Sequence, residues 1–155
     1  MALASWTNSK VVERFGLRRV GHGGAAGLVV VSLIHAAVVL LGLETLGSFI
    51  VLQALTMSCF AFASSNLGTL AMEHMAPIAG TASSVQGMIG TIGGAILGYV
   101  IGQQFDGTVI PFVVGTASCA VGGFVLIVLT EPKRLFASIG AHRADPFPPV
   151  PEEVA

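Results

Sequence analysis

Long apolar stretches without charged side chains dominate the pattern of this chain. Lys, Arg, Asp and Glu are all absent from residues 20–43, 45–72, 74–105 and 107–130. These stretches lack both the polar faces of soluble helices and the two-residue alternation of barrel strands. About 20 helical residues cross a hydrocarbon core about 30 Å thick, and lipid offers the backbone no other hydrogen-bond partners. The pattern therefore predicts four transmembrane helices, over residues 24–43, 47–71, 80–103 and 109–130.

Composition supports the same fold class. Of the 155 residues, 54% are hydrophobic and 10% are charged, whereas about 25% are charged in an ordinary globular protein. We expect an all-α polytopic membrane protein with a four-helix region over residues 24–130, in contact with membrane lipid. Residues 1–23 are expected to hold the last turns of a truncated helix and a basic cytoplasmic loop. Residues 131–155 are expected to form a cytoplasmic tail, disordered from about residue 145.

Positive charge lies at the two ends of the chain. All seven Lys and Arg residues flank the apolar region: Lys10, Arg14, Arg18, Arg19, Lys133, Arg134 and Arg143. Basic flanks mark the cytoplasmic side of a membrane protein. Four crossings then place both termini in the cytoplasm, with the loops near residues 44–46 and 104–108 facing outward. The predicted localisation is the cell inner membrane, as a multi-pass protein.

The third predicted span carries a row of small residues on one helical face. The glycines of this row are Gly87, Gly90, Gly94, Gly98 and Gly102. At about 100° per residue, they gather with other small residues within roughly 120° of the helix surface. Small residues allow the backbones of membrane helices to approach closely. We expect this face to contact another helix, either as a fixed packing seam or as a surface that slides or bends during transport.

Four polar residues inside the spans are candidates for a cavity or for ion coupling: His35, Gln53, Asn66 and Gln86. Polar groups at membrane depth are costly and usually face a cavity or another helix. His35 could couple to protons, because histidine titrates near neutral pH, or it could simply hydrogen-bond a neighbouring helix. The three amides could equally line a substrate path or hold helices together.

The sequence offers no motif for soluble-enzyme chemistry. Paired carboxylates, metal-binding Cys/His spacing, a nucleophile elbow and a P-loop are missing. Cys59 and Cys119 fall inside predicted spans, where free thiols act as small packing residues. We expect no metal, no cofactor, no nucleic-acid partner and no enzyme activity. A membrane enzyme using His35, Glu73 and His74 is disfavoured, because His35 is expected at mid-bilayer and the other two at the surface.

The basic loop resembles a motif of major facilitator superfamily transporters. Residues 8–19 read NSKVVERFGLRR, and the residues that match the motif are Glu13, Arg14, Gly16, Arg18 and Arg19. In that family an acidic–Arg–x–Gly–basic loop joins the second and third helices and, in weaker form, the eighth and ninth. Glutamate stands where aspartate is common, and Leu17 is an extra residue before the basic pair. Both departures fit the weaker second copy.

A second stretch resembles the Bcr/CflA-type drug/proton antiporters of the same superfamily. Residues 73–84 read EHMAPIAGTASS, followed by the glycine-rich span and by FDGT at residues 105–108. The resemblance covers residues 2–136 and implies helices nine to twelve of a twelve-helix transporter. It also implies proton-coupled efflux of drug-like molecules by alternating access.

The same resemblance implies missing N-terminal helices, and we expect the chain to be inactive without them or to self-associate. The alternative is a different class of protein. In that reading the chain is a free-standing four-helix membrane protein, acting as an oligomeric small transporter or a structural subunit.

Overall fold

The computed structural model describes residues 10–73 and 75–130. Its long helices are α2 (Leu17–Leu40), α3 (Leu46–Met72), α4 (Ala79–Gly102) and α5 (Ile110–Thr130), and a short 3₁₀ turn, η1 (Ala76–Ile78), precedes α4. The described residues contain no strand. All four long helices are long and apolar enough to cross a membrane, which confirms the predicted all-α fold with four membrane-length helices. The predictions for residues 1–9, His74 and the tail at 131–155 lie outside the described residues.

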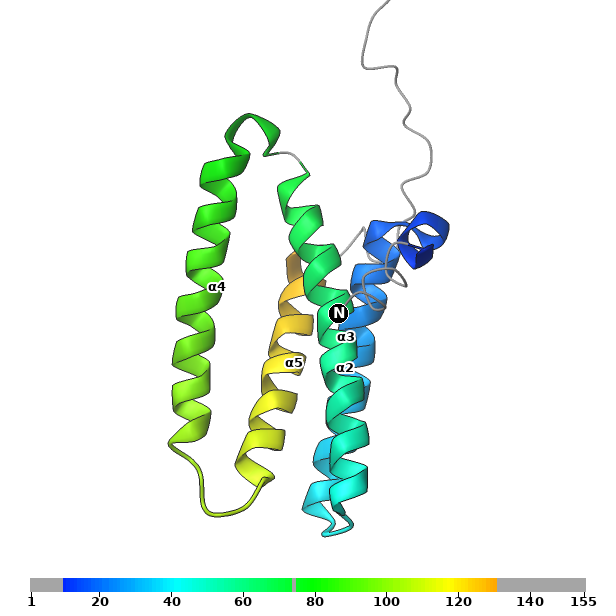
Figure 1. Ribbon diagram of the computed structural model, residues 1–155, viewed down its shortest axis with the longest axis vertical. Helices are drawn as coiled ribbons and strands as arrows, with labels where there is room; N and C mark the ends of the chain where they lie inside the picture. Colours follow the sequence, from blue (N-terminus) through cyan, green and yellow to red (C-terminus); the bar gives the residue numbers. More distant parts are fainter. Residues whose placement is uncertain (1–9, 74, 131–155) are drawn as a thin grey trace, which may run out of the picture.

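The four helices alternate in direction. Figure 1 shows the α2–α3 turn and the α4–α5 connection at one end of the molecule, and the α3–α4 connection at the other end. α2 packs against both α3 and α5, whereas α4 touches its neighbours sparsely and stands to one side. The buried core joins α2 to α5 and consists of Ala36, Val39, Val113 and Ala117, with Phe49 of α3 packed against it.

The first membrane helix begins earlier than predicted. α2 starts at Leu17, although the sequence predicted a span that starts at residue 24. Gly16 precedes it with a φ of 84°, a conformation that favours glycine, and it separates the helical residues 10–15 from α2. Arg18 and Arg19 therefore belong to the first turn of a helix and not to a loop. The expected loop was wrong for residues 17–23, because the charged pair was taken to lie outside the helix.

A tight turn joins α2 to α3. Gly42 has a φ of 68° just after the end of α2. Thr45 and Ser48 then form a capping box, in which the Ser48 N–H donates to Thr45 Oγ1 at 3.2 Å and the Thr45 N–H donates to Ser48 Oγ at 2.8 Å. Such reciprocal bonds satisfy orphan donors at a helix start. The turn, including Glu44, therefore has a defined path.

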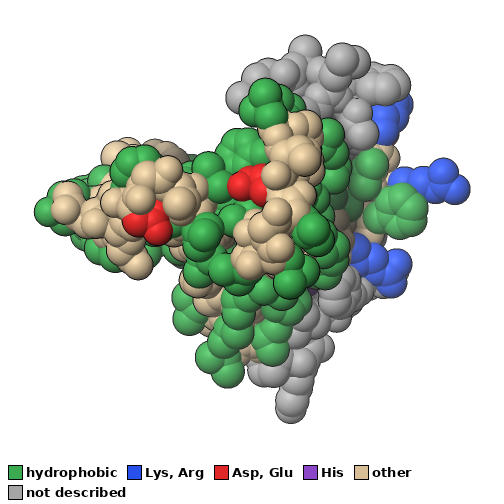
Figure 2. Space-filling model, turned by 90° about the horizontal axis from the view of Figure 1, so that it is seen from below, with side chains coloured by type: hydrophobic (Ala, Val, Ile, Leu, Met, Phe, Trp, Pro, Cys, Tyr) green, Lys and Arg blue, Asp and Glu red, His purple; other side chains and the backbone are tan. Residues whose placement is uncertain are grey.

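α4 is the least packed helix of the described chain. None of its residues is buried. Figure 2 views the end that carries the α2–α3 and α4–α5 turns, and one lobe of mixed hydrophobic and other atoms projects away from the remaining helices on that face. The three-helix unit of α2, α3 and α5 thus holds the core, with α4 attached beside it.

Candidate functional site

A close glycine contact joins α2 to α3. Gly21, Gly24 and Gly27 lie on the α2 face that meets α3, and a Cβ added at Gly24 would lie 2.8 Å from the backbone nitrogen of Ala63. A Cβ at Gly27 would lie 3.3 Å from Cys59 Sγ. Gly24 therefore has no room for a side chain. Sequence reasoning missed this seam: Gly21 was assigned to a loop, and the three-residue spacing that links it to Gly24 and Gly27 was not used.

The predicted glycine row on α4 meets nothing else in the described chain. A Cβ added at any of its glycines would find no atom within 4 Å, and these glycines are Gly87, Gly90, Gly94, Gly98 and Gly102. The partly buried positions of α4 are instead Ala82, Gly93 and Ile101. At 3.6 residues per turn, those positions lie roughly 100° around the helix from the row. The row is therefore turned away from α3 and α5.

α4 meets α5 mainly near the end of the molecule that carries the α4–α5 connection. A Cβ at Gly115 of α5 would lie 2.7 Å from Ile101 Cγ1, so the Ile101 side chain sits directly over the glycine. Toward the other end, a Cβ at Gly68 of α3 would lie 3.7 Å from Gln86 Nε2. Through these two contacts α4 runs beside α5 and α3 without taking part in the buried core.

The structure does not bring the four polar candidates together. His35 and Asn66 are buried, Gln53 is half-buried and Gln86 is exposed. Asn66 lies in the α3 half that leads to α4, where its Nδ2 donates to the Phe62 carbonyl at 2.7 Å. His35 lies in the last third of α2, at the opposite end of the α2–α3 pair. The candidates thus occupy separate places, and the described residues show no common cavity among them.

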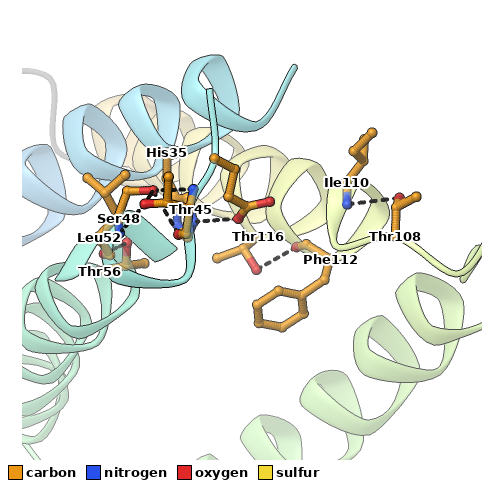
Figure 3. A network of polar contacts seen from close by, with 10 residues as sticks. His35, Thr45, Ser48, Leu52, Thr56, Thr108, Ile110, Phe112 and Thr116 are labelled. Atoms are coloured by element: carbon orange, nitrogen blue, oxygen red, sulfur yellow. Dashed lines mark hydrogen bonds and ion pairs between the residues drawn. The ribbon is translucent and has the colours of Figure 1, made fainter. Parts of the chain in front are cut away.

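His35 faces a residue that sequence reasoning did not select. Its Nε2 lies 4.0 Å from Oε1 of Glu44 in the α2–α3 turn, and its ring meets the Phe49 ring edge-on with centroids 5.3 Å apart. Figure 3 shows His35 close to Thr45 and Ser48 of the capping box. The pairing depends on the path of the turn, which folds Glu44 back onto α2. The available signal was that Glu44 is the only charged residue between residues 20 and 72.

Two other buried polar side chains, Ser32 and Thr56, are satisfied within their own helices. Ser32 Oγ donates to the Val29 carbonyl at 3.1 Å, and Thr56 Oγ1 donates to the Leu52 carbonyl at 2.8 Å. His22 is also buried, at 1% exposure. It was not a candidate because the predicted span began after it.

The basic motif lies at the end of the molecule where α2 begins. Lys10 Nζ lies 3.8 Å from Glu13 Oε2, and the Arg14 guanidinium lies 5.8 Å from the centre of the Phe15 ring. An open, mainly apolar groove of about 320 Å³ adjoins this segment between residues 11–24 and α3. Of the motif residues only Arg19 lines it, and none of the four polar candidates does.

The α4–α5 connection carries a fixed carboxylate. Asp106 accepts hydrogen bonds on Oδ1 from the Thr108 hydroxyl at 2.6 Å and from the Thr108 N–H at 2.9 Å. These bonds, the hydroxyl one foremost, hold the pKa of Asp106 below its usual value. Figure 2 shows two separate acidic patches on this end of the molecule. The two turns at this end therefore present negative charge, and the segment before α2 presents positive charge.

Within the described ranges, no group of three or more His, Cys, Asp or Glu side chains could hold a metal ion. Comparison of the chain with protein-family models, with curated proteins and with solved structures gave no match. What the molecule offers is a set of membrane-length helices, a buried His35–Glu44 contact and an unoccupied glycine face. Its relation to the major facilitator superfamily is accordingly a proposal.

Proposed function

We propose that this chain is part of a proton-coupled exporter of drug-like molecules of the major facilitator superfamily, working by alternating access. The observation that carries the proposal is the glycine row of α4, which meets no atom of the described chain. Two resemblances support it: the loop motif around Glu13, Arg14 and Gly16, and the stretch from Glu73 through the glycine-rich helix.

A glycine row that faced lipid would weaken the helix without a compensating contact. Each glycine in a helix interior costs about 1 kcal/mol relative to alanine, and an exposed row recovers none of this through packing. Association of membrane helices depends on close backbone contact at small residues. The row therefore suits a contact with a further helix, and its lack of bulky side chains suits a contact that shifts between two states.

In this proposal the four helices work within a larger helical assembly. The further helices would cover the α4 row and would enclose, together with α4 and its neighbours, the path of the exported molecule. The second candidate function rests on the same row. If the partner of α4 is another copy of this chain, the protein is an oligomeric small transporter or a structural subunit.

The first experiment determines which protein the cell makes. The gene is tagged at its chromosomal 3′ end, and the product is sized on a denaturing gel and cross-linked in the membrane. A band far above 15.8 kDa supports the larger exporter. A band at 15.8 kDa that cross-links to multiples of itself supports the oligomeric alternative.

Efflux of ethidium from energised cells then tests the activity, with and without a protonophore. We expect Gly94→Leu to abolish protonophore-sensitive efflux without lowering the amount of protein in the membrane. The matched control is Met88→Leu, which changes an exposed side chain on the other face of α4 and should leave efflux intact. Wild-type cells that show no such efflux, or a fully active Gly94→Leu variant, would contradict the exporter proposal.

A further inference from the structure

Two buried polar atoms face each other at the α2–α3 turn without a hydrogen bond. Nε2 of His35 and Oε1 of Glu44 are 4.0 Å apart, and the side chains are 2% and 23% exposed. Neither atom has a hydrogen-bond partner among the residues that the structure describes. Buried polar atoms in folded proteins nearly always have partners, so an orphaned pair calls for an explanation.

The surroundings fix the His35 ring and the backbone of Glu44, whereas the Glu44 carboxylate is partly exposed. Phe49 contacts the His35 ring edge-on, and the next residue of α2, Ala36, belongs to the buried core between α2 and α5. Glu44 sits between Gly42, which has a positive φ, and the capping box that starts at Thr45. The His35 ring is therefore fixed, the Glu44 carboxylate can move over a short range beside it, and the pair is part of the junction of three helices.

No other ionisable group of the described residues is placed to interact with His35 or Glu44. α3 and α5, which pack on α2, carry no Asp, Glu, Lys, Arg or His, and their only thiols are Cys59, half-buried on α3, and Cys119, exposed on α5. The other ionisable residues of α2 are Arg18, Arg19 and His22. His22 lies thirteen positions before His35, roughly 20 Å away at 1.5 Å per residue. Asp106 lies exposed in the α4–α5 connection.

We propose that His35 and Glu44 form a proton-binding pair that fastens the α2–α3 turn to the helix core. When the imidazole gains a proton from water, its Nε2–H donates a charge-assisted hydrogen bond to the Glu44 carboxylate, and such bonds are shorter and stronger than neutral ones. The gap of 4.0 Å closes to hydrogen-bond distance. When the imidazole returns the proton to water, the attraction is lost and the partly exposed carboxylate turns to solvent.

The expected pH dependence follows from this exchange. Histidine changes charge between about pH 5 and pH 8. The stabilising contact is present when His35 is protonated, so it operates at the acidic end of that range and is lost as the pH rises. The proton arrives from the side of the membrane where the α2–α3 turn lies. The proposal concerns the stability of this junction and does not depend on the chain being an exporter.

Thermal unfolding of the full chain in lipid nanodiscs tests the pair. Tm is measured at about pH 5.5 and about pH 8, which bracket the titration of histidine, for the wild type and for Glu44→Gln. We expect the wild-type Tm to fall between the two pH values, and Glu44→Gln to remove roughly 2–4 °C of that fall. The matched control is Glu73→Gln, which removes an exposed carboxylate at the opposite end of α3 and should keep the wild-type pH profile.

Two more proteins complete a double-mutant cycle: the single variant His35→Gln and the double variant that also carries Glu44→Gln. At acidic pH the double variant should melt no lower than the less stable single variant, because either substitution removes the same contact. Should His35→Gln fail to fold, the comparison of Glu44→Gln with the wild type still decides. A Glu44→Gln variant that keeps the wild-type difference in Tm between the two pH values would overturn the proposal.

Discussion

At the scale of single residues, Gly24 and the backbone of Ala63 set how closely α2 and α3 approach. The absent side chain allows the two backbones to pack directly, with the Gly24 Cβ position 2.8 Å from the Ala63 nitrogen. The neighbouring Gly23 has no atom within 4 Å of its Cβ position. Two adjacent glycines of one helix thus have opposite tolerance of a methyl group.

We therefore expect Gly24→Ala to lower the free energy of unfolding by about 1–3 kcal/mol, the usual cost of overpacking. Gly23→Ala should be neutral or stabilising by up to about 1 kcal/mol, because alanine is the better helix former. Unfolding of both variants by denaturing detergent, followed by circular dichroism, measures the difference. Equal effects of the two substitutions would show that α2 and α3 do not approach closely at Gly24.

The sequence identified polar residues that are buried inside the helices, but it did not identify the residues that they contact. Apolar context alone marked His35 and Asn66 as polar residues inside a span, and both are buried. The Glu44 partner could not be predicted, because it depends on the path of a turn that Gly42 and Thr45 determine. Gln86 lies on the side of α4 that faces Gly68 of α3, and it is exposed because α4 packs only loosely there.

At the scale of elements, α4 is held less firmly than α2, α3 and α5. It has no buried residue, and its close contact with α5 is the Ile101 side chain over Gly115. Segments with few buried contacts open and move at low free-energy cost. The position of α4 relative to the other helices should therefore vary in the chain without a partner.

Spin labels and pulsed electron paramagnetic resonance measure this variation. In a background with Cys59→Ala and Cys119→Ala, labels at exposed Leu33 of α2 and Leu126 of α5 should give a narrow distance distribution. Labels at exposed Ile92 of α4 and Leu126 should give a broad one. Equally narrow distributions would show that α4 is fixed without a further helix.

The number and order of the elements could be predicted because charge-free length alone identifies a membrane-length helix. Their contacts could not, since lipid-facing and protein-facing residues are equally apolar. The glycine row illustrates this: its spacing predicts a contact, but the described helices that pack near α4 lie on another side of it. The start of α2 escaped prediction because Arg18 and Arg19 continue the helix beyond the apolar stretch.

At the scale of the whole molecule, the distribution of charge agrees with the alternating direction of the helices. Lys10, Arg14, Arg18 and Arg19 cluster where α2 begins, and the acidic turns with Glu44 and Asp106 lie at the far end. Basic residues favour the cytoplasmic side. The structure thus presents one basic and one acidic end, and the basic end should face the cytoplasm.

Cysteine labelling in intact cells tests this orientation. In the same cysteine-free background, Leu43→Cys and Phe105→Cys, both at exposed positions in the acidic-end turns, should react with a membrane-impermeant maleimide added outside. Lys10→Cys should react only after permeabilisation. The reverse pattern would place the basic end outside and contradict the predicted localisation of that end.

The weak attachment of α4 also bears on how the chain enters the membrane during synthesis. α4 is the least hydrophobic of the four helices, and α5, which follows after a short connection, is the most hydrophobic. Insertion by the translocon depends on the summed apolar character of a segment. We expect α4 to wait at the translocon until α5 emerges, so that the two enter as a hairpin. Its glycine row then reaches the bilayer only together with α5, so a contact between that row and any further helix can form only once this hairpin has entered.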